Sequence, residues 1–254
     1  MQRAAPSVTW RLVPFGIEDA RTAMALEEVL LDEVAAGATP TARLWGWAGD
    51  AVTVGRFQCV EDEVDLEQAR ALRCALTRRM SGGGAMYHAV GGELAFSITA
   101  PQSILGDGVR GAYATVCGHV VRALGSLGLE ARVEGVNSVM VGGRKVSGSA
   151  QRRSRGVVQQ HGTLLHRADG TTMGRLLLAG RRPPSIRGTP SRWYPVTGVG
   201  DEVGCALDDV RAALQAALLD GREWASVPWG RTELGLAQTL ARTRYASPGW
   251  VLSR

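Results

Sequence analysis

The stretch RRMSGGGAMYHAVGGELAFSIT, from Arg78 to Thr99, decides the fold because it places a glycine-rich turn between apolar runs. Three consecutive glycines follow Ser81, and residues without a Cβ allow positive φ and let backbone N–H groups approach a ligand closely. The flanking runs, CALT before the turn and AMY and LAFSIT after it, have the pattern of buried strands. We therefore expect a turn that is held by the protein core.

The charged residues around these glycines suggest an anion site. Arg78 and Arg79 supply fixed positive charge at the entrance of the turn, where a phosphate or carboxylate could be paired in a bidentate way. His88 lies just beyond the glycines, where a polar side chain that faces a pocket is expected. A glycine run alone is weak support for a phosphate cradle, because the same residues could form a solvated surface turn.

The bulk composition favours a soluble globular protein with an acidic partner. The 254 residues fit one large domain, or one domain with a small appendage. The net charge of +5 and the isoelectric point of about 9.4 favour nucleotides or an acidic protein domain as partners. The sequence contains no basic helix and no sheet motif studded with aromatic residues, so we do not expect nucleic acid as a partner.

The cysteine pattern and the absence of long apolar runs bear on metal binding and location. The four cysteines have no CxxC spacing and no metal-ligand spacing with histidine, so no protein-ligand metal cluster is predicted. Reduced thiols are typical of a cytosolic protein. The first residues lack the pattern of a signal peptide, and no run of eighteen apolar residues occurs. We therefore expect a cytoplasmic protein that does not insert into membranes.

Hydrophobic periodicity predicts a chain in which helices and strands alternate. The predicted helices span residues 19–35, 64–72, 109–127, 173–179, 207–219 and 232–244. The predicted strands outside the glycine stretch span residues 10–14, 43–47, 51–55, 139–141, 145–147 and 156–165, and residues 1–8 form a frayed terminus. The sequence AGD between 43–47 and 51–55 predicts a hairpin. Trp45 and Trp47 then share a face, which is either core or an aromatic wall for an apolar ligand.

A second informative stretch, GVNSVMVGGRKVSGSAQRRSRGVVQQHGTLL, runs from Gly135 to Leu165. Lys145 lies just past a hairpin turn between apolar neighbours, so its ammonium can be aimed inward. The small residues SGSA that follow let a ligand or a strand approach closely. The polar residues of QQHGT lie on an otherwise apolar strand and must be paired internally or face a pocket. Residues 181–195 are rich in Pro, Arg and Ser, and predict a long loop that closes over a site or docks a partner.

The motifs RRMSGGGAMYHA, NSVMVGGRKVSGSA and QHGTLL together resemble the lipoate-protein ligase A family, within the group of biotin and lipoate ligases and octanoyltransferases. The likeness covers nearly the whole chain, from the first helix and GRFQ to RYASPGW. It implies one ligase-like catalytic domain over residues 1–254, of α/β class, with a curved, mostly antiparallel mixed sheet flanked by helices and a helical C-terminal segment over 200–254. The small accessory domain of longer ligases would be absent, so that a separate protein supplies it or none is needed.

The resemblance also implies an activity and a set of site residues. Such ligases use ATP and magnesium to join lipoate or octanoate to AMP, and then pass the acyl group to a lysine of a small acceptor lipoyl domain. Lys145 would be catalytic, bridging the carboxylate and the α-phosphate. The implied ATP and adenylate site comprises Arg79, Ser81, Gly82, Gly83, Gly84, Tyr87, Asn137 and Thr163. The implied lipoate site comprises Arg79, Gly84, His88, Lys145, Gly148, His161 and Gly162.

Two other activities stay open. Octanoyltransferases share the fold but act through a cysteine thioester without ATP, and neither position of that cysteine is matched here: Glu130 to Ser138 holds none, and a PCG sequence after HG is missing. A non-catalytic lipoyl- or nucleotide-binding relative is the second alternative. It is motivated by Ala89, where the family usually has aspartate, and by the missing accessory domain. Gly92, where asparagine is common, is a second departure from the family pattern. Biotin ligase is disfavoured because a GRGRxGRxW-like loop is missing.

Overall fold

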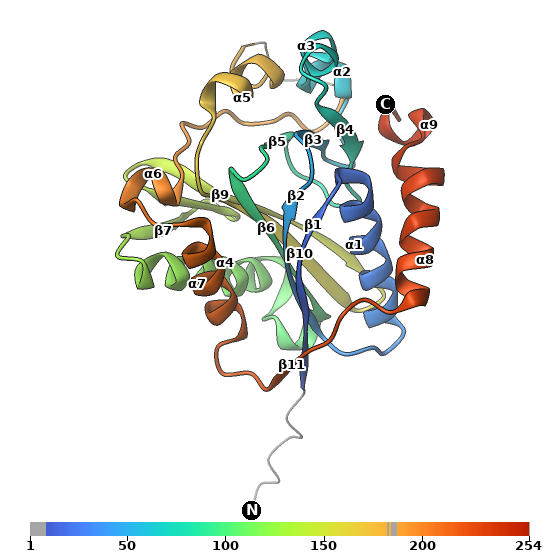
Figure 1. Cartoon of the computed structure of the whole chain (residues 1–254), viewed down its shortest axis with the longest axis vertical. Helices are drawn as coiled ribbons and strands as arrows, with labels where there is room; N and C mark the ends of the chain where they lie inside the picture. Colours follow the sequence, from blue (N-terminus) through green and yellow to red (C-terminus); the bar gives the residue numbers. More distant parts are fainter. Residues whose placement is uncertain (1–8, 182, 184–186, 254) are drawn as a thin grey trace, which may run out of the picture.

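A large mixed sheet runs through the centre of the protein in the computed structural model, which describes residues 9–181, 183 and 187–253 (Figure 1). Its strands lie in the order β11-β1-β2-β6-β10-β9-β8-β7. Pairing is antiparallel from β2 to β7, whereas β1 is parallel to both of its neighbours. The predicted fold class, a mostly antiparallel sheet flanked by helices, is confirmed. The strands are β1 (Trp10–Glu18), β2 (Thr41–Trp47), β6 (Glu93–Pro101), β7 (Ala131–Glu134), β8 (Ser138–Val141), β9 (Arg144–Ser154), β10 (Val157–Leu165) and β11 (Trp224–Ser226).

A second, smaller sheet carries the glycine turn. It consists of β4 (Ala75–Arg78), β3 (Ala51–Val54) and β5 (Met86–His88), in that order. The predicted hairpin between 43–47 and 51–55 is therefore wrong, because β2 pairs with β1 and β6 while β3 pairs with β4 and β5. Asp50 explains the switch between sheets, since its carboxylate accepts hydrogen bonds from the Tyr87 hydroxyl and the Val90 N–H. These bonds tie the turn to the small sheet.

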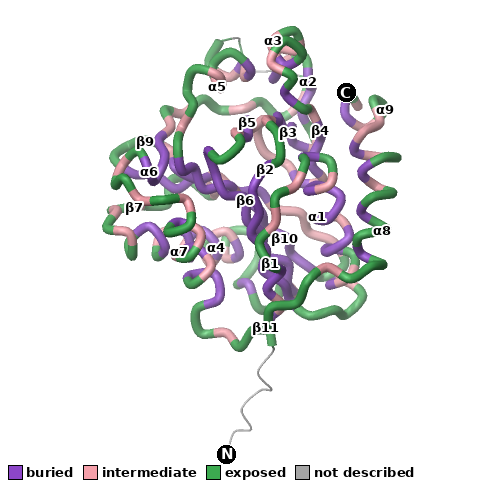
Figure 2. Tube along the Cα trace, viewed as in Figure 1, coloured by how far each residue is buried: buried purple, intermediate pink, exposed green. Residues whose placement is uncertain are grey.

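Helices cover both faces of the large sheet. On one face α4 (Gly108–Ser126) and α7 (Leu207–Leu219) bury their apolar stripes against β6, β9 and β10. On the other face lie α1 (Ala20–Ala35) and α8 (Arg231–Leu240), which pack against each other. The central strands are buried on both sides, while the outer helix surfaces are exposed (Figure 2). Burial of these apolar faces is the main force that stabilises the two layers.

The remaining predicted helices occur with shifted ends. The helix expected over 64–72 occurs as α3 (Leu66–Ala71), which Asp65 caps through the Gln68 N–H, and the short helix α2 (Val60–Glu63) before it was not predicted. The helix expected over 173–179 begins earlier, as α5 (Gly170–Leu176). The last predicted helix is α8 followed by a π-helical turn, η2 (Ala241–Tyr245). Short helices η1 (Gln102–Ile104), α6 (Val199–Val203) and α9 (Pro248–Val251) were not predicted.

Two further predictions concern the N-terminal residues and membrane insertion. The frayed terminus expected over 1–8 lies outside the described residues. No helix in the described ranges is both long enough and apolar enough to cross a membrane.

Candidate active site

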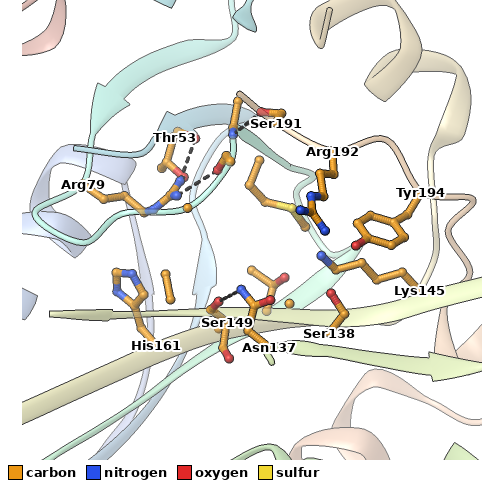
Figure 3. A pocket seen from close by; sticks show the side chains of 18 of the residues that line it. Thr53, Arg79, Asn137, Ser138, Lys145, Ser149, His161, Ser191, Arg192 and Tyr194 are labelled. Carbon is orange, nitrogen blue, oxygen red and sulfur yellow. Dashed lines mark hydrogen bonds between the residues drawn. The ribbon is translucent and has the colours of Figure 1, made fainter. Parts of the chain in front are cut away.

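A cavity of about 380 Å³ lies between the two sheets (Figure 3). The glycine turn and β5 form one wall, and the ends of β9 and β10 form the opposite wall together with the β7–β8 turn. Met24, Trp45, Trp47 and Ala95 contribute an apolar surface. Both predictions for the two tryptophans, core and ligand wall, therefore apply, because each belongs to the core beside α1 and also lines the pocket.

The glycine turn is built around the Arg79 side chain. Its Nη1 donates to the carbonyl and hydroxyl oxygens of Thr53, both at 2.8 Å, and its Nη2 donates to the carbonyls of Gly82 and Gly84 at 3.0 and 2.8 Å. Gly83 has φ of +89°, which an L residue rarely adopts. Burial, with a smaller contribution from the neighbouring Arg78, lowers the pKa of Arg79 to about 10. Arg79 thus holds the turn in shape while it lines the pocket.

Arg78 does not lie at the entrance of the turn, as the sequence had suggested. Its side chain is fully buried. Burial of this charge is possible because the guanidinium donates to backbone carbonyls on two separate segments. Nη1 donates to Gly55 at 2.7 Å and to Gln58 at 2.8 Å, while Nη2 donates to Val251 at 2.9 Å. Trp250 returns a hydrogen bond from its indole nitrogen to the Arg78 carbonyl. The residue therefore joins the GRFQ segment to the C-terminal helix α9.

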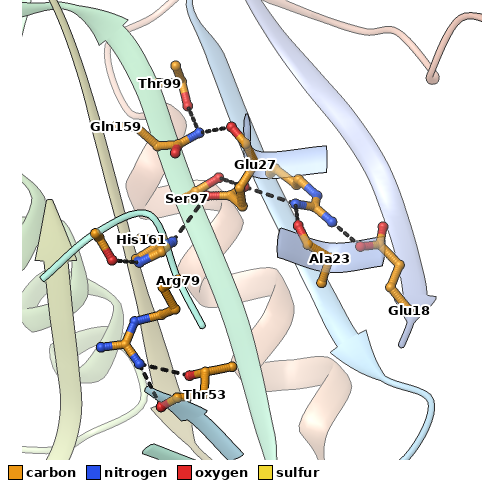
Figure 4. Close-up of polar contacts among 11 residues, drawn as sticks. Glu18, Ala23, Glu27, Thr53, Arg79, Ser97, Thr99, Gln159 and His161 are labelled. Carbon is orange, nitrogen blue, oxygen red and sulfur yellow. Dashed lines mark hydrogen bonds and ion pairs between the residues drawn. The ribbon is translucent and has the colours of Figure 1, made fainter. Parts of the chain in front are cut away.

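Ser81 and His161 tie the glycine turn to the large sheet and to α1 (Figure 4). The Ser81 hydroxyl lies 2.7 Å from His161 Nε2, and His161 Nδ1 lies 3.3 Å from the Glu27 carboxylate. Glu27 also accepts from Ser97 at 2.8 Å and from Arg43 at 2.9 Å. Although burial raises the pKa of Glu27, the bonds from His161 and Arg43 outweigh that effect, so its pKa lies below the ordinary value. An ionised carboxylate is thus maintained inside the protein.

Lys145 enters the pocket from β9, opposite the glycine turn. A Cβ at Gly148 would lie 2.8 Å from the Lys145 Cε, so a larger residue there would displace the end of this side chain. The ammonium lies 4.8 Å from the centre of the Tyr194 ring, a cation–π contact. Burial lowers the pKa of Lys145. In the described part of the chain, no carboxylate forms an ion pair with it.

The strand ends beside Lys145 supply polar groups and close approach. Asn137 donates from Nδ2 to the Ser149 carbonyl at 2.6 Å, which fixes the β7–β8 turn against β9. A Cβ at Gly162 would meet the Phe96 ring at 2.7 Å and the Gly148 carbonyl at 2.8 Å. Thr163 lines the pocket, and its buried hydroxyl finds no hydrogen-bond partner among the described residues. A buried polar atom of this kind is costly unless a ligand or water satisfies it.

The predicted site residues divide into those that line the pocket and those that lie behind it. The pocket is lined by Arg79, Gly83, Gly84, His88, Asn137, Lys145, Gly148, His161, Gly162 and Thr163. Ser81, Gly82 and Tyr87 do not line it, and Tyr87 instead packs among apolar side chains beside α3 and α5. The ring of His88 stacks on Trp47 at 4.1 Å, but its nitrogens are occupied by Glu93 at 2.5 Å and Thr53 at 2.8 Å.

The two positions that depart from the family pattern also lie behind the pocket. Ala89 belongs to the same apolar cluster as Tyr87, and neither it nor Gly92 is among the pocket-lining residues. The carbonyl of Gly92 accepts the N–H groups of His166 and Arg167 at 2.8 and 2.9 Å. A Cβ at Gly92 would lie 2.8 Å from that of Ala89. The two small residues therefore fit each other.

The sequence reasoning missed a third contributor to the pocket. Thr189, Ser191, Arg192 and Tyr194 line it, although 181–195 had been expected only as a loop that could close over a site. Residues 182 and 184–186 of that loop lie outside the described structure. The motif spacing offered no signal for these side chains, because the loop reaches the pocket only through tertiary contacts. One such contact is the hydrogen bond from the Ala85 N–H to Ser191 Oγ at 2.8 Å.

The pocket has few groups that could hold a metal ion. In residues 9–181, 183 and 187–253, no cluster of three or more His, Cys, Asp or Glu side chains is arranged to bind one. No described lining residue is a cysteine, and Cys59, Cys74 and Cys117 are buried elsewhere. The pocket therefore offers cations, hydroxyls and backbone N–H groups, a set that suits a carboxylate or phosphate ligand.

Two relatives that are similar to this chain carry different names. An octanoyltransferase LipM from Moorella thermoacetica is 28% identical and covers 98% of this chain and 100% of its own. A putative lipoate-protein ligase A from Aeropyrum pernix is 35% identical and covers 89% of this chain and 86% of its own. Both are thus similar over most of their length, and they differ in the activity that their names state.

Solved structures and a family model identify the fold family. A bipartite lipoate protein ligase from Thermoplasma acidophilum, studied with its E2 lipoyl domain, has a TM-score of 0.83 at 25% identity over 97% of this chain and 96% of its own. A lipoate-protein ligase A bound with ATP has a TM-score of 0.82 at 26% identity over 96% and 98% of the two chains. The model of the lipoyl protein ligase A/B catalytic domain matches residues 19–219. The chain therefore belongs to the lipoyl protein ligase A/B catalytic domain family.

Proposed function

We propose that this protein is an ATP-dependent lipoate-protein ligase, which activates lipoate or octanoate as the acyl-AMP and transfers the acyl group to a lysine of an acceptor lipoyl domain. The observation that carries the proposal is the position of Lys145, which faces the glycine turn across the pocket without an anionic partner among the described residues. A cation held in this way can bring a carboxylate and a phosphate together by reducing their repulsion.

The proposed reaction has two halves. In the first half, a carboxylate oxygen attacks the α-phosphorus of ATP, the bond to the β-phosphate breaks, and diphosphate leaves with the electron pair. In the second half, the amine of the acceptor lysine attacks the acyl carbonyl, AMP leaves, and the amine gives up a proton. The apolar surface at Met24, Trp45 and Trp47 suits the acyl chain. The Lys145 ammonium would balance the charge of the carboxylate and then of the departing AMP.

Magnesium, which the family implies, does not have a dedicated site in the described residues. Glu134 is the described carboxylate that lines the pocket, and it lies 3.6 Å from Arg132. A single exposed carboxylate does not fit a protein-held metal centre. Magnesium often binds mainly through phosphate oxygens and water, so an ion that arrives with the nucleotide needs no such cluster.

The competing function is octanoyl transfer without ATP, and the name of the Moorella relative favours it. That chemistry needs a cysteine that can carry the acyl group as a thioester. The best-placed thiol is Cys117 on α4, which lies 3.7 Å from Ser149 Oγ but is buried in the core beneath the sheet. Burial raises the pKa of Cys117, which reduces the thiolate fraction. These features favour the ligase.

The test is incubation of the purified protein with ATP, lipoate and an acceptor lipoyl domain, followed by intact mass measurement of the acceptor. We expect a lipoyl-sized mass increase that requires ATP and disappears in Lys145→Ala. A parallel reaction supplies octanoyl-acyl carrier protein without ATP, with Cys117→Ala as the matched variant. Acceptor modification in that reaction, lost in Cys117→Ala, would assign the transferase instead. Binding of lipoate or ATP without any acceptor modification would indicate a non-catalytic relative.

A further inference from the structure

Residues 187–197, which we call the covering segment, cross the pocket and are attached at both ends. At one end Ser191 Oγ accepts the Ala85 N–H at 2.8 Å, which fixes the segment to the glycine turn. At the other end the Lys145 N–H donates to the Pro195 carbonyl at 2.8 Å, and the Thr197 N–H donates to the Lys145 carbonyl at 3.0 Å. The residues between these attachments are therefore held over the pocket.

Arg192 lies between the two attachments and lines the pocket, although it is exposed to solvent. Figure 3 shows its guanidinium directed into the same region as the Lys145 ammonium, beside the Tyr194 ring. In the part of the chain that the structure describes, neither cation has a carboxylate partner. Two cations that face the same space repel each other, and a multivalent anion between them would remove that repulsion.

The order of groups along the pocket indicates which anion fits. The apolar surface at Trp45 and Trp47 suits an acyl chain, Lys145 is half-buried beneath Tyr194, and Arg192 is at the solvent-exposed mouth. If the carboxylate and the α-phosphate meet at Lys145, the remaining phosphates must point toward the mouth. An arginine there can bind two phosphate oxygens at once in a fixed, planar geometry.

We propose that Arg192, together with Lys145, forms a subsite for the diphosphate end of a nucleoside triphosphate, with Arg192 on the β- and γ-phosphates. The inference rests on the proposed adenylation. When the bond between the α-phosphorus and the bridging oxygen breaks, the diphosphate takes the electron pair and gains negative charge. Arg192 stabilises that charge as it develops. Transfer of the acyl group from acyl-AMP to the acceptor lysine involves no diphosphate, so Arg192 acts in the first half-reaction alone.

The test compares the two half-reactions in the full chain. Adenylation is measured as lipoate-dependent exchange of labelled diphosphate into ATP, and transfer is measured from synthetic lipoyl-AMP to an acceptor lipoyl domain. In Arg192→Ala we expect kcat/KM for ATP in exchange to fall by about ten-fold or more, and transfer to stay within about two-fold. Arg192→Lys should recover part of the loss. Arg242→Ala, an exposed arginine of η2 outside the pocket, is the matched control and should change neither rate.

Three outcomes contradict the subsite. If Arg192→Ala exchanges diphosphate at the wild-type rate, Arg192 does not bind the phosphate chain. If exchange and transfer fall equally, Arg192 contacts the acyl-AMP instead, and if transfer alone falls, it contacts the acceptor. In these three cases the wild-type protein still catalyses exchange, so the ligase assignment survives. A wild-type protein without ATP-dependent exchange would overturn both the ligase assignment and the subsite.

Discussion

The two walls of the pocket use their positive charges in opposite ways. On the wall formed by the glycine turn, Arg79, and behind it Arg78, donate to backbone carbonyls, and no ligand is needed to satisfy them. On the opposite wall, the Lys145 ammonium contacts the Tyr194 ring, and among the described residues neither it nor Arg192 on the covering segment has an ion-pair partner. The arginines of a conspicuous motif can thus fix the conformation of a site, while cations from other segments bind the reacting anions.

The largest expected effect comes from removing the charge on the ligand-binding wall. Lys145→Ala should reduce the rate of lipoyl-AMP formation by about 10²–10³-fold, because it removes the cation aligned with the reacting phosphate. Its midpoint of thermal unfolding should stay unchanged or rise, since a half-buried ammonium without an anionic partner is lost. Diphosphate exchange and calorimetry measure the two quantities. A variant that keeps its activity would place the catalytic charge elsewhere.

The second variant, Arg78→Ala, tests the structural role of the arginines beside the glycine turn. Arg78→Ala leaves the carbonyls of Gly55, Gln58 and Val251 without their buried donor. We expect the free energy of unfolding to fall by about 3 kcal/mol or more, measured by urea titration. Stabilisation by ATP of whatever fraction folds should be preserved, because Arg78 does not reach the pocket. If stability were unaffected while ATP binding was lost, the division between the walls would be wrong.

Ser81→Ala tests the tie between the glycine turn and the sheet. The variant loses the 2.7 Å hydrogen bond to His161 without opening a large cavity. We expect KM for ATP or lipoate to rise about five- to ten-fold with little change in kcat, because a loosened turn binds ligand less well but still presents the same cations. Ser97→Ala is the control, because Ser97 donates to Glu27 in the same network but lies on β6, away from the turn. A fall in kcat alone would give Ser81 a part in the chemistry.

The pH dependence of activity should also separate the walls. Burial lowers the pKa of Lys145 from its ordinary value of 10.5, so the ammonium is present at low pH and is lost as pH rises through that reduced value. The rate of exchange should therefore fall on the alkaline side at a pH below 10.5. Lys145→Arg, to the extent that it retains activity, should shift this limb to higher pH. An alkaline limb at the same pH in both proteins would assign the titration to another group.

The same contrast explains how far sequence reasoning could reach. Periodicity predicted the main helices and strands because these elements bury one face, as in α7, whose bounds match the prediction. Motif order led to Lys145, Gly148 and Thr163, which do line the pocket. The partners of β2 and β3 could not be predicted, because every residue of both strands is buried. An apolar sequence alone does not indicate which strand it pairs with.

The contribution of Arg192 was beyond sequence reasoning for a different reason. Its neighbours in the chain form no secondary structure, and its place in the pocket depends on attachments made by Ser191 and Pro195 to distant segments. The burial of Arg78 was equally hidden, since its guanidinium is satisfied by carbonyls of two segments distant in sequence, Gly55 and Gln58 on one and Val251 of α9 on the other. An arginine in a motif is therefore expected to have a role in binding or in folding. Which of the two it has depends on whether its hydrogen-bond partners lie within the protein.

Tyr87 gives the smallest expected effect and the sharpest division between motif membership and ligand contact. It stands three residues after the glycines, yet its hydroxyl donates to Asp50 at 2.9 Å behind the pocket, and burial, reinforced by Asp50, raises its pKa. Tyr87→Phe removes this one bond and should cost about 1 kcal/mol of unfolding free energy. KM for ATP and for lipoate should not change, because the lining of the pocket is untouched. A clear rise in either KM would show that the hydrogen bond between Tyr87 and Asp50 influences the conformation of the glycine turn. Residues behind the glycine turn would then affect ligand binding.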